Sequence, residues 1–173
     1  MIQKSLKFLV AVALFGLYSP VASYGQEVIF LTRHVNPQKL LRMDAPVTDE
    51  TPLSEAGRGL AMTLAERLKD AGIDAIYSSK TVRTIQTAEP LAKLLGLEIN
   101  KMPRRNMDGL IRTLREKHPR DRVLVVGHFT TMPGILRRLG HTKRVKIDLP
   151  VWNDLFVIVP QANGPPVVTY IHY

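Results

Sequence analysis

The chain has 173 residues, of which 45% are hydrophobic and 23% are charged, and its formal net charge at pH 7 is +9. This length and composition predict one globular domain with enough residues to bury a sizeable core. The complete lack of cysteine excludes disulfides, thiol nucleophiles, zinc–thiolate sites and a lipidated N-terminal cysteine.

The N-terminal residues have the pattern of a secretory signal peptide. Two basic residues, Lys4 and Lys7, precede an apolar run over residues 8–18, which is shorter than the roughly 20 residues that a membrane span needs. Small residues then favour cleavage after Ser23, with Gly25 as the alternative position. We therefore predict that this segment is removed on export, and an uncleaved membrane anchor is the alternative.

Removal of the signal peptide, residues 1–23, leaves a predicted single domain over residues 24–173. That domain carries 22 basic and 15 acidic residues, a net charge of +7, which would attract anionic partners. Basic clusters could also suit nucleic acid, but the sequence has no nucleic-acid motif and no aromatic stacking pattern, so we expect no such partner. The predicted location is the periplasm or the external medium, with no membrane contact after cleavage.

The first strand of the domain is predicted over residues 27–34. Apolar residues that favour strands run directly into Arg33 and His34, as in a buried parallel strand whose carboxyl end opens into a ligand-binding crevice. Residues 35–52 contain three prolines and form a loop that is long enough to be functional. A helix follows, with Ser54 as its N-cap and leucines at helical spacing.

The rest of the chain alternates between helices and strands. The predicted helices begin near residues 54, 81, 106 and 130 and end near 70, 95, 118 and 139, and the later predicted strands cover residues 74–79, 97–102, 123–128, 154–159 and 167–173. Pro90 lies inside the second helix, where it predicts a kink or a restart. The last two strands flank a Gly-Pro-Pro turn and predict a hairpin at the sheet edge. The whole pattern predicts a three-layer α/β/α sandwich around a mostly parallel sheet.

Three positions place polar residues at strand exits or helix starts. They are the Arg33-His34 pair, Arg83 and His128. Because parallel strands end at one edge of the sheet, these residues can share one pocket although they are far apart in sequence. A phosphoryl group in transfer spreads negative charge over three oxygens, which arginine donors and helix N-termini stabilise. We therefore interpret His34 as the nucleophile of a phosphoryl-transfer site, with a pKa that the neighbouring cations lower.

Four blocks of residues occur in a recognisable order. They are Thr32-Arg33-His34, then Leu53-Ser54-Glu55-Ala56-Gly57, then Tyr77-Ser78-Ser79 with Arg83-Thr84-Ile85-Gln86-Thr87-Ala88, and finally Val125-Val126-Gly127-His128. Together they resemble the histidine phosphatase (phosphoglycerate mutase-like) superfamily, and the resemblance extends from residue 27 to about residue 160. It implies that His34 becomes transiently phosphorylated while Arg33, Arg83 and His128 hold the phosphate, with both histidines catalytic. Water then hydrolyses the phosphohistidine, and the resemblance implies neither a metal nor a cofactor.

The chain departs from the superfamily pattern at two places. Val35 and Asn36 stand where the family usually has glycine and often an acidic residue, which would reshape the floor of the pocket. The glutamate proton donor of mutase-type members has no counterpart between residues 99 and 115, where Asp108 is the single carboxylate. Asp108 is either the acid or an ordinary residue of a helix N-terminus, and the second interpretation is favoured.

The loop after the first strand offers three further candidate acids, Asp44, Asp49 and Glu50, which the sequence does not rank. A positioned general acid contributes about 10²–10⁴-fold to the rate. A site without one would lose most on substrates with poor leaving groups. The hypothesis is therefore a preference for good leaving groups, or an acid supplied from this loop.

We predict a metal-independent phosphohydrolase that acts on a phosphorylated small molecule or a phosphoprotein. A non-catalytic phosphate- or phosphoprotein-binding module of the same fold is the alternative, and a mutase is less favoured because the chain has little room for insertions that close over a sugar phosphate. Trp152 is interpreted as core or sheet-edge packing, and His118, His141 and His172 as structural or solvated residues. The sequence predicts neither the natural substrate nor the oligomeric state.

Overall fold

The computed structural model describes residues 28–38, 47–145, 147 and 151–173. The predicted signal peptide and both of its cleavage positions lie outside the described residues, as does the candidate acid Asp44. None of the helices in the described part of the chain combines the length and the apolarity that a membrane crossing needs.

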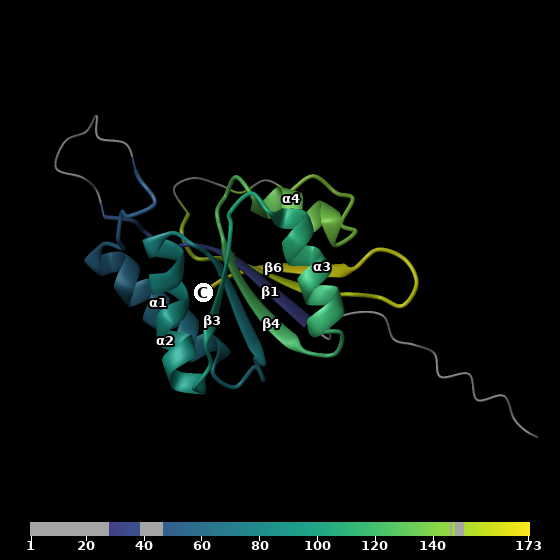
Figure 1. The fold of residues 1–173 in the computed structure, drawn as a ribbon, viewed down its shortest axis with the longest axis horizontal. Helices are drawn as coiled ribbons and strands as arrows, with labels where there is room; N and C mark the ends of the chain where they lie inside the picture. Colours follow the sequence, from purple (N-terminus) through teal and green to yellow (C-terminus); the bar gives the residue numbers. More distant parts are fainter. Residues whose placement is uncertain (1–27, 39–46, 146, 148–150) are drawn as a thin grey trace, which may run out of the picture.

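Six strands of the described chain form one sheet at the centre of the molecule (Figure 1). In chain order they are β1 (Val28–Arg33), β2 (Ala75–Ser79), β3 (Ile99–Met102), β4 (Arg122–Gly127), β5 (Asp154–Val159) and β6 (Val167–His172). Across the sheet the order is β3-β2-β4-β1-β5-β6. The first four strands run parallel, β5 runs antiparallel to β1, and β5 and β6 form an antiparallel hairpin at the edge. The mostly parallel sheet and the edge hairpin are therefore confirmed.

Helices cover both faces of the sheet. Their bounds are α1 (Glu55–Leu68), α2 (Val82–Leu95), α3 (Met107–Lys117) and α4 (Met132–Arg138). The first two pack on one face and the last two on the other (Figure 1). Alternate residues of β4 show this division, because Val123 and Val125 lie in the core with α3 and α4, whereas Leu124 and Val126 lie in the core with α1 and α2. The predicted three-layer α/β/α sandwich is confirmed.

Capping side chains begin helices α1 and α3, and a glycine ends helix α2. Ser54 Oγ accepts a hydrogen bond of 3.0 Å from the Gly57 amide at the start of α1, and Asn106 caps α3 in the same way through Gly109. Both bonds satisfy amides that have no partner inside their helix. At the end of α2, Gly96 adopts a left-handed conformation with φ of +65°, which glycine adopts without steric cost.

Pro90 does not divide α2, so of the predicted kink or restart the restart does not occur, and the helix reaches Leu95 as predicted. The helix is continuous through the proline, although proline lacks the amide hydrogen that a helix interior uses and costs about 3 kcal/mol there. Ala88, Leu91 and Ala92 on either side of it are buried and pack in the same core cluster as α1 and the sheet. This packing outweighs the local cost, because most helix stability in proteins comes from tertiary contacts.

The loop that follows β1 is held together at its two ends. Pro37 forms an antiparallel bridge with Leu53, and the amide of Ser54 donates a hydrogen bond of 3.0 Å to the carbonyl of Asn36. The start of α1 therefore lies against the residues that leave β1. Gly57 lies at this contact, since a Cβ atom added there would collide with the Asn36 carbonyl oxygen.

Gly57→Ala should therefore destabilise the protein by about 1–3 kcal/mol, the range expected when an extra methyl group is forced into a packed interior. Gly59 provides a matched control on the same helix, because a Cβ atom added there meets no atom within 4 Å. Gly59→Ala should instead stabilise the protein by about 0.5–1 kcal/mol, because alanine is the better helix former. Urea denaturation of the two variants measures both effects, and similar effects of the same sign would contradict the close contact.

Candidate active site

The two histidines of the candidate site extend from neighbouring parallel strands. His34 follows β1 and His128 follows β4, and the two strands pair with Arg33 opposite Gly127. The amide of His34 continues this pairing by donating a hydrogen bond of 3.0 Å to the carbonyl of Gly127. The two imidazole rings consequently lie with their centroids 5.2 Å apart and their planes at 67°. The structure thus brings together two residues that are 94 positions apart in sequence.

The surroundings of His34 favour one neutral form of its ring. The side chain is buried, and Nδ1 lies 2.9 Å from the carbonyl oxygen of Val35. Because a carbonyl oxygen can only accept a hydrogen bond, Nδ1 carries the proton and Nε2 keeps its lone pair. Burial is the main cause that lowers the pKa of His34 to about 4, and the positive charges of Arg83 and Arg33 lower it further. The ring is therefore neutral at physiological pH, mainly because burial removes it from water and partly because the positive charges of the arginines disfavour its protonated form.

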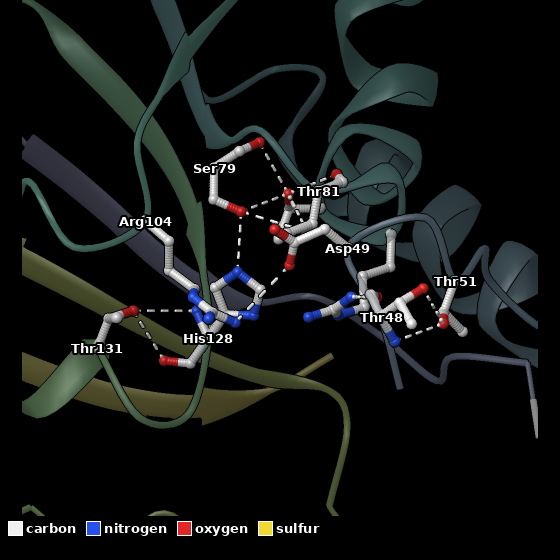
Figure 2. Close-up of polar contacts among 10 residues, drawn as sticks. Thr48, Asp49, Thr51, Ser79, Thr81, Arg104, His128 and Thr131 are labelled. Atoms are coloured by element: carbon white, nitrogen blue, oxygen red, sulfur yellow. Dashed lines mark hydrogen bonds and ion pairs between the residues drawn. The ribbon is translucent and has the colours of Figure 1, made fainter. Parts of the chain in front are cut away.

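His128 is fixed at both its backbone and its ring (Figure 2). Its Nε2 atom lies 2.8 Å from the hydroxyl of Ser79, which in turn lies 2.8 Å from the hydroxyl of Thr84. The hydroxyl of Thr131 accepts a hydrogen bond from the amide of His128 and donates one to its carbonyl, and it makes no side-chain cap bond to α4. The pKa of His128 is lowered to about 3, first by burial and then by His34 and the nearby arginines. This ring is neutral as well.

Arg83 lies on the first turn of α2 and is buried, so it is not a solvated helix residue. Its guanidinium donates a hydrogen bond of 2.7 Å to the carbonyl of Thr48 in the loop after β1. Its positive charge lowers the pKa of both His34 and His128, so Arg83 acts electrostatically on both rings.

Arg33 is held by aromatic rings and a backbone carbonyl. The guanidinium lies 4.1 Å from the ring centroid of Trp152 and 5.5 Å from that of Phe129, and it donates a hydrogen bond of 2.9 Å to the carbonyl of Val151. Burial lowers the pKa of Arg33, and the negative charge of the buried Asp154 opposes this effect. These contacts orient a cation that is almost fully removed from water.

The sequence predicts core or sheet-edge packing for Trp152, and the structure gives it a further role. Besides contacting Arg33, its ring lies 5.7 Å from the ring of His34. It therefore covers the histidine and the arginine together. No sequence signal identified it, because Trp152 reaches β1 only through the antiparallel pairing of β5, which begins two residues after it.

Arg104 also lies at this edge of the sheet, shortly after the end of β3. It lines the same small cavity as His128 and Ser79, which has a volume of about 30 Å³. The signal that would have found it is the one that found Arg33, namely a basic residue at the carboxyl end of a parallel strand.

The candidate acids have different surroundings. Asp108 pairs with Arg138 through two contacts of 2.6 Å and 3.1 Å, and this pairing lowers the pKa of Asp108. An ionised carboxylate is a poor proton donor, so the interpretation of Asp108 as an ordinary helix N-terminal residue is favoured. Asp49 lies 3.9 Å from the guanidinium of Arg104 at the edge of the site. Glu50 is exposed in the same loop.

Val35, at the position where the resemblance leads one to expect glycine, does not line the pocket floor. Its side chain is fully buried and packs with Leu53 and Ala61. Its amide donates a hydrogen bond of 3.2 Å to the hydroxyl of Thr87. The larger residue is thus accommodated in a small core between β1 and α1, while its carbonyl orients His34.

The described residues contain no group of three or more carboxylate, histidine or cysteine side chains that could hold a metal ion. The charged groups nearest to the two imidazoles are guanidiniums, which repel cations and attract anions. What this arrangement can do chemically is hold a tetrahedral anion against a neutral histidine nitrogen.

Comparisons with known proteins agree with this chemistry. Residues 29–107 match the family model of the histidine phosphatase superfamily (branch 1). A curated relative from Photorhabdus laumondii subsp. laumondii, named probable phosphoglycerate mutase GpmB, is 33% identical over 107 residues, which cover 56% of this chain and 49% of the relative. The chain thus spans about half the length of that relative.

Solved structures show the same fold. The protein histidine phosphatase SixA complexed with tungstate has a TM-score of 0.63 and 19% identity, and the match covers 84% of this chain and 96% of that one. The phosphoglycerate mutase from Bacillus anthracis str. Sterne has a TM-score of 0.67 and 18% identity, with 86% and 94% covered. At these identities the likeness concerns the fold, and the described architecture is phosphoglycerate mutase-like.

Both histidines should remain neutral far below the usual histidine pKa of about 6.5. We expect the ring of His34 to titrate near pH 4 and that of His128 near pH 3, because burial and the arginines disfavour the charged forms. An NMR titration of the ring carbon-bound protons, assigned with the variants His34→Asn and His128→Asn, measures both values. A midpoint near 6.5 for either ring would show that water reaches it freely and would contradict the described burial.

Proposed function

We propose that this chain, as a member of the histidine phosphatase superfamily, is a phosphohydrolase that works through a phosphohistidine. In this proposal Nε2 of His34 takes the phosphoryl group and water then removes it. The observation that carries the proposal is the state of the His34 ring, which is neutral, protonated on Nδ1 and held beside His128. A buried imidazole prepared in this way is a nucleophile.

The first step uses the lone pair of Nε2. This nitrogen attacks phosphorus, the bond between phosphorus and the leaving oxygen breaks, and the electron pair of that bond departs with the oxygen. The ring becomes positively charged, and the hydrogen bond from Nδ1 to the Val35 carbonyl stabilises that charge. In the second step a water oxygen attacks phosphorus, the electron pair of the phosphorus–nitrogen bond returns to Nε2, and dihydrogen phosphate is released.

Arg33, Arg83 and His128 would surround the phosphoryl oxygens during both steps. Two buried guanidiniums supply fixed positive charge where the transition state is negative, which is the main way that proteins accelerate phosphoryl transfer. The packing of Arg33 on Trp152 and the contact between His128 and Ser79 orient two of these groups before the substrate arrives. Little reorganisation is then needed as the charge develops.

Proton delivery to the leaving group is the step for which this site is least equipped. Asp108 is engaged with Arg138, and the carboxylate of Asp49 lies beside Arg104 and is 68% exposed. We therefore propose that the enzyme prefers substrates whose leaving group departs without a proton. Phosphorylated small molecules and phosphoproteins both include such substrates.

We also propose that the enzyme works outside the cytoplasm, since residues 4–23 have the charge, apolar run and small residues of a secretory signal. Its substrate would then be encountered in the periplasm or in the external medium.

The phosphohistidine can be trapped directly. After brief incubation with a phosphorus-32-labelled phosphate donor and quenching in denaturant at alkaline pH, we expect labelled protein whose label is released by acid, together with continuous release of phosphate. His34→Ala should carry no label, because it lacks the nucleophile. A binding module without turnover would show neither label nor phosphate release, while phosphate or vanadate would still raise its melting temperature by mass action.

A series of alkyl and aryl phosphates tests whether the reaction proceeds without a general acid. We expect kcat/KM to fall steeply as the pKa of the leaving alcohol rises, with an aryl phosphate favoured over an alkyl phosphate by about 100-fold or more, the contribution of a positioned acid. Asp49→Asn should show the same dependence. Equal rates across the series with chemistry rate-limiting would contradict the proposal, and a steeper dependence in Asp49→Asn would identify Asp49 as the acid instead.

A further inference from the structure

Arg104 is a positively charged residue at the site that the proposed reaction does not yet use. It lies between β3 and α3 and lines the same cavity as His128 and Ser79. Figure 2 draws it with His128 and Asp49, at the edge of the hydrogen-bonded cluster. It therefore lies on the β3 side of His128, whereas Arg33 lies on the opposite side with Trp152.

The positive charge of Arg104 acts on ionisable side chains inside the site. It lowers the pKa of His128 and that of Arg83, because its guanidinium is near enough for its charge to act on both groups. Its one ion pair among the described residues is with Asp49 at 3.9 Å, and the two side chains are 39% and 68% exposed. A long, solvent-exposed pair of this kind contributes little, and an anionic ligand could displace the carboxylate at small cost.

The charges of the site also exceed what one phosphoryl group requires. A phosphoryl group carries up to two negative charges, which Arg33 and Arg83 can match. Arg104 adds a third cation on the side of His128 where β3 ends. An arginine stays protonated in proteins, so it cannot act as the missing acid, but its planar donors suit a second phosphate-like anion.

We propose that Arg104 forms a second anion subsite and that the substrates are diphosphates, in which the transferred phosphoryl group is joined to another phosphate. This inference rests on the proposed function, because it names the leaving group of that reaction. Nε2 of His34 attacks the terminal phosphorus, the bond to the bridging oxygen breaks, and its electron pair stays on the departing phosphate. That phosphate needs no proton, and Arg104 stabilises its additional charge.

The size of the cavity beside His128 limits where the remainder of the substrate can lie. That cavity, of about 30 Å³, has room for water but not for an organic group, and His34, Arg33 and Arg83 are not among its lining residues. The group attached to the second phosphate must therefore extend outwards past Arg104, whose side chain is partly exposed. The subsite thus selects for the second anion and leaves the rest of the substrate in solvent.

Binding of two phosphonates tests the subsite without turnover. Methylenediphosphonate carries the second anionic group and resists hydrolysis, and methylphosphonate carries a single one. By isothermal titration calorimetry on the mature protein, we expect the first to bind at least about tenfold more tightly, the value of a charge-assisted contact. Arg104→Gln should abolish this preference and change methylphosphonate affinity by less than about twofold, since the first subsite is intact.

Two control variants separate a direct contact from other effects. Arg105 is the exposed neighbour of Arg104, and Arg105→Gln should keep the preference. Asp49→Asn should keep or increase it, because it removes the carboxylate that competes for Arg104. The inference is overturned by an unchanged preference in Arg104→Gln, by an equal loss in Arg105→Gln, or by an equal loss in Asp49→Asn, which would mean that Arg104 acts only by holding the loop.

The binding test and the trapping of the phosphohistidine fail independently. If His34 is labelled and Arg104→Gln still prefers the diphosphonate, the diphosphate subsite is contradicted and the proposed phosphohydrolase is supported. If the preference for the diphosphonate depends on Arg104 but the protein never becomes labelled, the phosphohydrolase is contradicted and a diphosphate-binding site is supported.

Discussion

The parallel pairing of β1 with β4 is the constraint on which the candidate site depends. Its register sets Arg33 opposite Gly127 and is continued by the hydrogen bond from the His34 amide to the Gly127 carbonyl. A slip of one residue would turn each side chain to the other face of the sheet. Since β4 is a central strand with buried residues on both faces, such a slip would also disrupt both cores. The two core clusters therefore maintain the distance between the imidazoles.

The site is costly to the fold. The Nε atoms of Arg33 and Arg83 and one carboxylate oxygen of Asp154 are buried without a hydrogen-bond partner among the described residues, and each such group costs about 1–3 kcal/mol. Proteins tolerate orphaned polar groups mainly where function requires them. Here they accompany guanidiniums that are fixed by Val151 and Thr48 on one side and keep positive charge for an anion. The packing of the two cores offsets this cost, so that the cations stay in place.

Most of the fold, and part of the site, follow from local sequence patterns. Strand ends, caps such as Ser54 and the meeting of His34 with His128 could be predicted, because buried strands, cap residues and the edge rule for parallel sheets are local or topological signals. The contribution of Trp152 depends on how β5 pairs with β1, and the fate of Asp108 depends on Arg138, a residue on another helix. Continuity at Pro90 depends on core packing. Long-range contacts decide all three, and periodicity does not encode them.

The same surroundings keep the two imidazoles neutral and place positive charge beside them. Burial first, and then the arginines, keep His34 and His128 unprotonated, which is the form in which His34 can attack phosphorus. In the unfolded chain the same rings bind protons near pH 6.5. Between that pH and about 4 the unfolded state therefore holds more protons than the native one, so stability is complete above 6.5 and declines as the pH falls. For His34 the decline amounts to about 3 kcal/mol, at roughly 1.4 kcal/mol per pH unit. The desolvation that makes the histidine a nucleophile is thus also what makes the fold sensitive to acid.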